Sequence, residues 1–127
     1  MDIKQNYSGM VVKNHYFSVP LDYDNNDSER LDIFAREIRS IKSSNKKRPY
    51  LCFFQGGPGY EAPRPITYSG WIKKACEKYA VILLDQRGTG LSSPITSTML
   101  EGKSDKNIAE YLSFFRADNI VKDAEFI

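Results

Sequence analysis

The chain has 127 residues, 41% of them hydrophobic and 27% charged, with a formal net charge of +2. This composition is typical of a globular domain and not of a disordered segment. So small a charge gives no basis for a nucleic-acid or anionic-membrane partner. No apolar run reaches the length of a membrane span, and the N-terminus lacks the apolar core of a signal peptide.

The two cysteines point to an intracellular setting. Cys52 and Cys76 form no CxxC pair, which argues against a disulfide framework or a metal site. We expect reduced thiols, a cytoplasmic location, and neither a metal nor another cofactor.

The first predicted elements form a hairpin. Apolar residues alternate over 17–21 and again over 31–36, and a cluster of Asp, Asn and Ser at 24–28 separates the two runs. Alternation predicts half-buried strands, and the intervening cluster predicts a turn. The pattern therefore indicates two antiparallel strands.

A strand–helix–strand unit follows. Residues 50–54 and 80–84 are continuous apolar runs, and apolar residues recur at helical spacing over 71–79. A strand that is apolar on both faces is expected to be covered on both sides. The fold class is therefore α/β: an antiparallel hairpin that leads into a parallel sheet flanked by helices.

The last third is predicted to be helical. Ile108, Tyr111, Leu112 and Phe115 share one helical face, and a second stripe runs over 120–127 with Asp118 as the expected N-cap. No strand follows this second helix, and a parallel sheet in that state has an open edge. We therefore expect residues 1–127 to be one incomplete domain.

The first candidate site follows the 50–54 strand. It reads Gln55-Gly56-Gly57-Pro58-Gly59, and ligand sites of open α/β sheets gather at the carboxyl ends of strands. Two glycines let the backbone approach a substrate, and Pro58 would stiffen the turn. A backbone N–H held there could stabilise an oxyanion. The alternative is a tight turn that binds nothing.

The second candidate site follows the 80–84 strand. Its residues Asp85, Gln86, Arg87 and Gly88 begin a turn that continues through Gly90, and the glycines allow a sharp exit from the strand. Asp85 and Arg87 are predicted to pair with each other and to fix this turn beside the first site.

A dinucleotide site is the weaker interpretation of this turn. Gly88-x-Gly90 matches part of the fingerprint, but Ser93 occupies the third glycine position. Pro94 follows, which argues against a helix N-terminus that could cradle a phosphate there.

Together these motifs resemble proline iminopeptidases of the α/β-hydrolase superfamily. The resemblance is carried by residues 55–59, Glu61-Ala62-Pro63-Arg64-Pro65, residues 85–92 and the tail 115–125. It implies the N-terminal part of an α/β-hydrolase fold and a serine aminopeptidase that releases N-terminal proline from small peptides. It implies no cofactor.

The resemblance also assigns roles to the glycine loop. Gly57, with Gly56 as the neighbouring possibility, would supply an oxyanion-hole N–H. Many relatives carry His where this chain has Gln55, so no role is assigned to that side chain. The loops that support the site are expected to be formed by the residues around these glycines and by the second turn: Gln55, Pro58, Gly59, Asp85, Gln86, Arg87 and Gly88.

No catalytic residue is predicted within the chain. The sequence contains no G-x-S-x-G; Ser92 comes closest, but Pro94 stands where the second glycine belongs. The triad order of this superfamily is Ser, then acid, then His, so Asp85 and the single histidine, His15, come too early. Nucleophile, acid and base, together with the cap, are expected downstream, and the chain alone is expected to be inactive.

Two other functions stay open on the sequence alone. One is a non-catalytic α/β interaction module. The other is an α/β-hydrolase that acts on a non-peptide, ester-like substrate, because related hydrolases share the general arrangement of loops.

Overall fold

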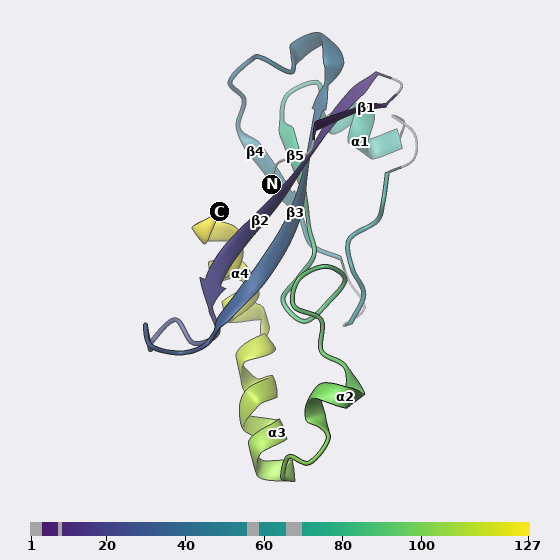
Figure 1. The fold of residues 1–127 in the computed structure, drawn as a ribbon. Coiled ribbons are helices and arrows are strands. Elements are labelled where there is room, and N and C mark those ends of the chain that lie inside the picture. The colour runs from purple at the N-terminus through teal and green to yellow at the C-terminus, as the bar shows by residue number, and fades with distance from the viewer. Residues whose placement is uncertain (1–3, 8, 56–58, 66–69) are drawn as a thin grey trace.

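A single mixed sheet organises the protein. The computed structural model describes residues 4–7, 9–55, 59–65 and 70–127. The sheet has five strands in the order β1-β2-β3-β5-β4, with helices on both of its faces (Figure 1). The strands are β1 (Lys4–Tyr7), β2 (Met10–Pro20), β3 (Arg30–Ser40), β4 (Tyr50–Phe53) and β5 (Ala80–Leu84).

The predicted hairpin is confirmed and is longer than the sequence suggested. β2 and β3 pair antiparallel along their whole length, from Met10 opposite Ser40 to Pro20 opposite Arg30. β1, which the sequence did not predict, pairs antiparallel with β2. β1 reads Lys-Gln-Asn-Tyr, and three polar residues in four give no alternation to detect.

The predicted strand–helix–strand unit is also confirmed. β4 and β5 are parallel neighbours, with Phe53 opposite Leu83, and α1 (Gly70–Ala75) connects them. All five residues of β5 are buried, as expected for a covered strand. The expectation for β4 is wrong, because Tyr50 and Leu51 are exposed. β4 is the edge strand, so the described residues cover it incompletely.

Helices cover the two faces of the sheet separately. On one face, Ile72 of α1 and the following Cys76 pack on Val81 and Leu83. On the other face, Ala124 of α4 (Ala117–Phe126) and the segment before it pack on Ile82 and the hairpin. The two helices lie on opposite sides of the sheet in Figure 1. Successive side chains of β5 therefore contribute to the two halves of the core in turn, because side chains along a strand alternate between its two faces.

The C-terminal third is helical, as predicted. It comprises α2 (Ser97–Leu100), α3 (Asp105–Leu112), a 3-10 turn at Ser113–Phe115 and α4. The predicted N-cap is wrong: Arg116 occupies that position, and Asp118 lies in the first turn of α4. A carboxylate in the first turn still interacts favourably with the positive, N-terminal end of the helix dipole.

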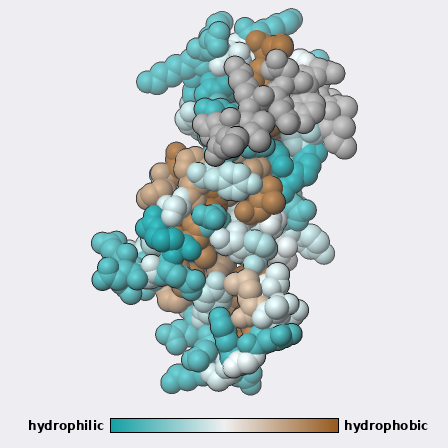
Figure 2. Space-filling view, in the orientation of Figure 1, coloured by the Kyte–Doolittle hydropathy of each residue, from teal (hydrophilic) through white to brown (hydrophobic). Residues whose placement is uncertain are grey.

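The lower end of the molecule is polar. α2 and α3 extend beyond the end of the sheet in Figure 1, and Figure 2 shows mostly hydrophilic residues in that region. Apolar side chains gather instead across the middle of this face. None of the helices in the described part of the chain combines the length and apolarity that crossing a membrane requires.

Candidate functional site

The two predicted site loops leave the sheet side by side. Because β4 and β5 are parallel neighbours, the segments after them emerge at the same edge. The side-chain amide of Gln86 donates a hydrogen bond to the main-chain carbonyl of Gln55 at 3.1 Å. The first residue of the glycine loop therefore touches the second turn.

The centre of the first loop is not described. Gly56, Gly57 and Pro58 lie outside the described residues, so their proposed oxyanion role stays a prediction. Gly59 is described and has φ +98°, a left-handed conformation that favours glycine.

A buried carboxylate joins the second turn to the proline-rich loop. The Asp85 side chain is fully buried and accepts two hydrogen bonds from the Arg64 guanidinium, at 2.9 and 2.8 Å. It also accepts from the main-chain N–H groups of Ala62, at 3.1 Å, and Leu91, at 3.0 Å. Four donors around one carboxylate compensate for its removal from water.

The predicted Asp85–Arg87 pair is therefore wrong. Arg87 is buried and binds the carboxylate of Asp123 on α4 through two hydrogen bonds of 2.7 Å. Each of the two residues binds a partner distant in sequence. Asp85 holds the proline-rich loop, whereas Arg87 holds the last helix.

A tyrosine completes the Arg87–Asp123 site. The Tyr23 hydroxyl donates to Asp123 at 2.6 Å. Burial, reinforced by the Asp123 carboxylate, raises the pKa of Tyr23 far above its usual value. The phenol therefore stays protonated and remains a donor at any physiological pH.

The second turn requires its glycines. Gly88 has φ +83° and Gly90 has φ +49°. A Cβ atom at Gly88 would lie 2.9 Å from the Phe115 ring, and one at Gly90 would overlap the Asp85 carboxylate. The glycines let the chain turn tightly between the buried carboxylate and the last helices.

Ser92 is a structural residue of this turn. Its side chain is fully buried, donates to the Asp85 carbonyl at 2.5 Å and accepts from the Phe34 N–H at 2.8 Å. A hydroxyl held in this way is not available to attack a substrate.

The dinucleotide interpretation finds no support in the turn. The chain after Gly90 continues as a turn and an irregular segment, and α2 begins only at Ser97 and has four residues. No helix N-terminus therefore follows the glycines directly to receive a phosphate.

His15 lies within β2, as expected for a strand histidine. Its Nε2 is 3.1 Å from Oε1 of Glu37 on β3. Burial alone would raise the pKa of Glu37, but its hydrogen bond and ion pair with Arg39, aided by His15, hold it below the usual value. These residues support the hairpin and do not belong to the strand-end loops.

The cysteines are both thiols. Burial raises the pKa of Cys52 to about 11, so this thiol is protonated and unreactive at neutral pH. Among the described residues, no group of three or more His, Cys, Asp or Glu side chains is placed to hold a metal ion.

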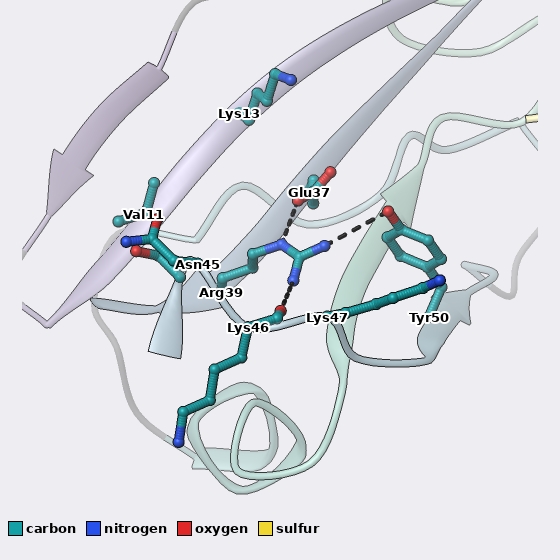
Figure 3. Close-up of a pocket in the computed structure, with 9 residues that line it drawn as sticks. Val11, Lys13, Glu37, Arg39, Asn45, Lys46, Lys47 and Tyr50 are labelled. Carbon is teal, nitrogen blue, oxygen red and sulfur yellow. Dashed lines mark hydrogen bonds and ion pairs between the residues drawn. The ribbon is translucent and has the colours of Figure 1, made fainter. Parts of the chain in front are cut away.

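A separate hollow lies at the other end of β4. It has a volume of about 450 Å³, and Tyr50, the first residue of β4, forms part of its wall (Figure 3). Arg39 occupies its centre, where it binds Glu37, the Lys46 carbonyl and the Tyr50 hydroxyl. Because Gln55 follows the opposite end of β4, this hollow is not part of the strand-end site.

Sequence reasoning missed Arg64 and Asp123, although one of them left a signal. Asp123 lies three residues after Ile120 and four before Ile127, within the apolar stripe of the last helix. A carboxylate in such a stripe predicts a buried cationic partner. Arg64 belongs to the motif over 61–65, but its place in a loop gives no periodicity from which a buried partner could be predicted.

The sheet and its strand-end loops define the class of protein. A mixed sheet, with a hairpin followed by a parallel β4-α1-β5 unit and helices on both faces, is consistent with part of an α/β-hydrolase fold. The predicted fold class is confirmed.

Comparison with known proteins gives the family resemblance in detail. The chain is 45% identical over 120 residues to a proline iminopeptidase from Aeromonas sobria, and the match covers 94% of the chain and 28% of that protein. It is 41% identical over 114 residues to the proline iminopeptidase aneH from Aspergillus aculeatus, a match covering 87% of the chain and 25% of that protein. No family model matches.

The resemblance drawn from the motifs is therefore confirmed. The chain is similar, over nearly its whole length, to about the N-terminal quarter of proline iminopeptidases.

Proposed function

We propose that this chain is the N-terminal part of a serine aminopeptidase that releases N-terminal proline from peptides. The strand-end loops would form one wall of its active site. The observation that carries the proposal is the contact between the loops after β4 and β5, made by Gln86 and Gln55. The names of two relatives, both proline iminopeptidases, favour a peptide over an ester-like substrate. We place the enzyme in the cytoplasm, where its two thiols would stay reduced.

In this proposal the chain contributes electrostatic stabilisation and not the nucleophile. Attack on the prolyl carbonyl converts it to a tetrahedral oxyanion, which a backbone N–H can stabilise. Gly57 would supply that N–H, with Gly56 as the neighbouring candidate. The 127 residues contain no G-x-S-x-G, and Ser92 is buried. Nucleophile, acid and base would therefore come from the part of the enzyme that corresponds to the rest of the relatives.

A chimera tests the function directly. In it, this chain replaces the matching 120 residues of the Aeromonas sobria proline iminopeptidase. We expect the chimera to hydrolyse prolyl p-nitroanilide and the 127-residue chain alone to give no turnover above blank. A folded chimera without activity would refute the proposal, as would inhibitor-sensitive turnover by the chain alone.

The oxyanion role of Gly57 has its own test in this chimera. Gly57→Pro removes the N–H, whereas Gly57→Ala keeps it and serves as the matched control. Loss of one oxyanion donor lowers kcat by about 100- to 1,000-fold. We expect a loss of that order for G57P and a much smaller one for G57A, measured by steady-state kinetics. Equal losses in both variants would show that the N–H is not used.

A further inference from the structure

We propose that the hollow at the start of β4 binds a small phosphate monoester. The site does not depend on the proposed aminopeptidase function, because the strand-end loops follow the opposite end of β4. Its volume of about 450 Å³ lies within the range of small-molecule pockets. That space is larger than a single phosphate group fills, so it has room for an organic part as well.

The walls of the hollow concentrate the positive charge of the chain. They include four cations and one anion, which give a formal charge of +3: Lys13, Arg39, Lys46, Lys47 and Glu37. The whole chain carries only +2, so the remainder is nearly neutral. The Glu37 carboxylate is already bound by Arg39 and His15, which lessens its repulsion of a ligand. A concave surface with this excess charge attracts anions.

The guanidinium at the centre of the hollow keeps donors for such an anion. An arginine side chain has five N–H groups. Those of Arg39 bind Glu37, the Lys46 carbonyl at 2.9 Å and the Tyr50 hydroxyl at 3.4 Å (Figure 3). For the other two, one on each terminal nitrogen, the described residues provide no acceptor. The side chain is only 16% exposed, so an anion in the hollow would satisfy donors that are largely shielded from water.

Arg87 shows how a purely structural arginine is bound in this chain. All five of its N–H groups have acceptors within the protein. Arg39 makes structural bonds too, but it retains two donors and lies beside open space. This difference assigns ligand binding to Arg39 and not to Arg87.

The chemistry of the walls favours a phosphate monoester over a carboxylate. A phosphate monoester carries nearly two negative charges at pH 7 and three acceptor oxygens. It therefore compensates more of the excess charge than a carboxylate does, and it suits the donor geometry of arginine. The Tyr50 ring is 63% exposed and forms part of the wall, so it offers apolar surface to the organic part of the ester.

An NMR titration of the 127-residue chain tests the site directly. The probes are phenyl phosphate, inorganic phosphate and benzoate, added at low ionic strength. We expect saturable amide shifts at the residues that line the hollow, with a Kd for phenyl phosphate of about 1 mM or lower. Inorganic phosphate should bind more weakly because it lacks the ring. Benzoate should bind at least about tenfold more weakly, because it has one charge and two oxygens.

Two variants test the cations. Lys46 and Lys47 are exposed, so Lys46→Gln/Lys47→Gln should fold normally and lower the affinity for phenyl phosphate by about 3- to 10-fold. Arg39→Lys keeps the charge but loses the fork of donors, and should lower the affinity by about tenfold or more.

The matched control is Lys73→Gln/Lys74→Gln on α1, which removes the same charge from exposed positions. α1 packs on the sheet face that carries Val12 and Ile38, whereas Val11 of the hollow points to the other face. The control should therefore keep the parent affinity.

Several results would overturn the proposal. Shifts that do not saturate, or that lie away from the hollow, would show that there is no such site. Equal binding of benzoate would exclude selection of a dianion, and equal binding of inorganic phosphate would exclude a role for the ester. Arg39→Lys also loses structural bonds, so the lysine variant decides if R39K does not fold. Unchanged affinity in K46Q/K47Q, or an equal loss in K73Q/K74Q, would show that the hollow is not what attracts the anion.

Discussion

Every N–H group of the Arg87 side chain has an acceptor. Two bind Asp123, and the others bind the main-chain carbonyls of Pro20, Leu21 and Phe114. These acceptors belong to the end of β2, the segment after it, the 3-10 turn and α4. Removing a guanidinium from water is costly, and only such complete pairing compensates for it. Arg87 thus connects the second site turn to both the hairpin and the last helix.

We therefore expect Asp123→Asn to lower the free energy of unfolding by about 3–5 kcal/mol, the usual effect of breaking a buried ion pair from one side. The Arg87 charge would remain buried with only neutral acceptors. Urea unfolding of the 127-residue chain, followed by circular dichroism, measures the change. Asp118→Asn, on the exposed side of the same helix, is the control and should cost no more than about 1 kcal/mol. A loss below 1 kcal/mol for D123N would contradict this assignment.

The residue types of this site could be predicted, but their partners could not. Asp85 and Arg87 lie two residues apart at a strand end, so a local pair was the simplest expectation. In the structure Asp85 binds a residue 21 positions earlier and Arg87 one 36 positions later. Such partners depend on how the loops and the last helix pack on the sheet, which the sequence around Asp85 and Arg87 does not show.

At the scale of elements, the hairpin carries a charged cluster on one face. Glu37 of β3 binds Arg39 on the same strand and His15 across the strand pair. Its side chain is only 14% exposed, so these bonds are well shielded from water. The ionised form of Glu37 therefore contributes to the stability of the hairpin.

This cluster predicts a pH dependence of stability. Because the pKa of Glu37 is lowered in the folded state, its contribution is complete above the unfolded value of about 4.5 and is lost as pH falls through the folded value. Glu37→Gln should cost about 1–3 kcal/mol at pH 7 and less at acidic pH. Urea unfolding at a series of pH values measures both. The exposed Glu101→Gln is the control, and a cost for E37Q that does not change with pH would contradict the prediction.

The elements themselves followed the sequence pattern where the pattern was strong. β2, β3 and β5 have alternating or continuous apolar residues, and all three were expected. β4 has an apolar run of the same kind, yet Tyr50 and Leu51 are exposed. Apolar residues on both faces show that a strand can be covered on both sides. Whether the strand is buried depends on which other elements pack against it.

At the scale of the whole molecule, the two parallel strands of the sheet differ in how well they are covered. β5 lies between β3 and β4 and is fully buried, whereas β4 has no neighbour on its outer side among the described strands. Two residues of β4 are exposed, Tyr50 at 63% and Leu51 at 38%. Phe54, directly after the strand, is 39% exposed. An exposed apolar edge strand offers both unpaired main-chain groups and apolar surface to another molecule.

We therefore expect the 127-residue chain to self-associate through the β4 edge. Sedimentation velocity should show a weight-average mass that rises with concentration. Leu51→Lys should shift the chain toward monomer, because a charge on an edge strand opposes edge-to-edge pairing. Val121→Lys is the matched control: Val121 is 49% exposed but lies on α4, so this variant should associate like the parent chain. Equal behaviour of L51K and the parent would place the association elsewhere, and a parent chain that stays monomeric at every concentration would show that the β4 edge is protected in solution.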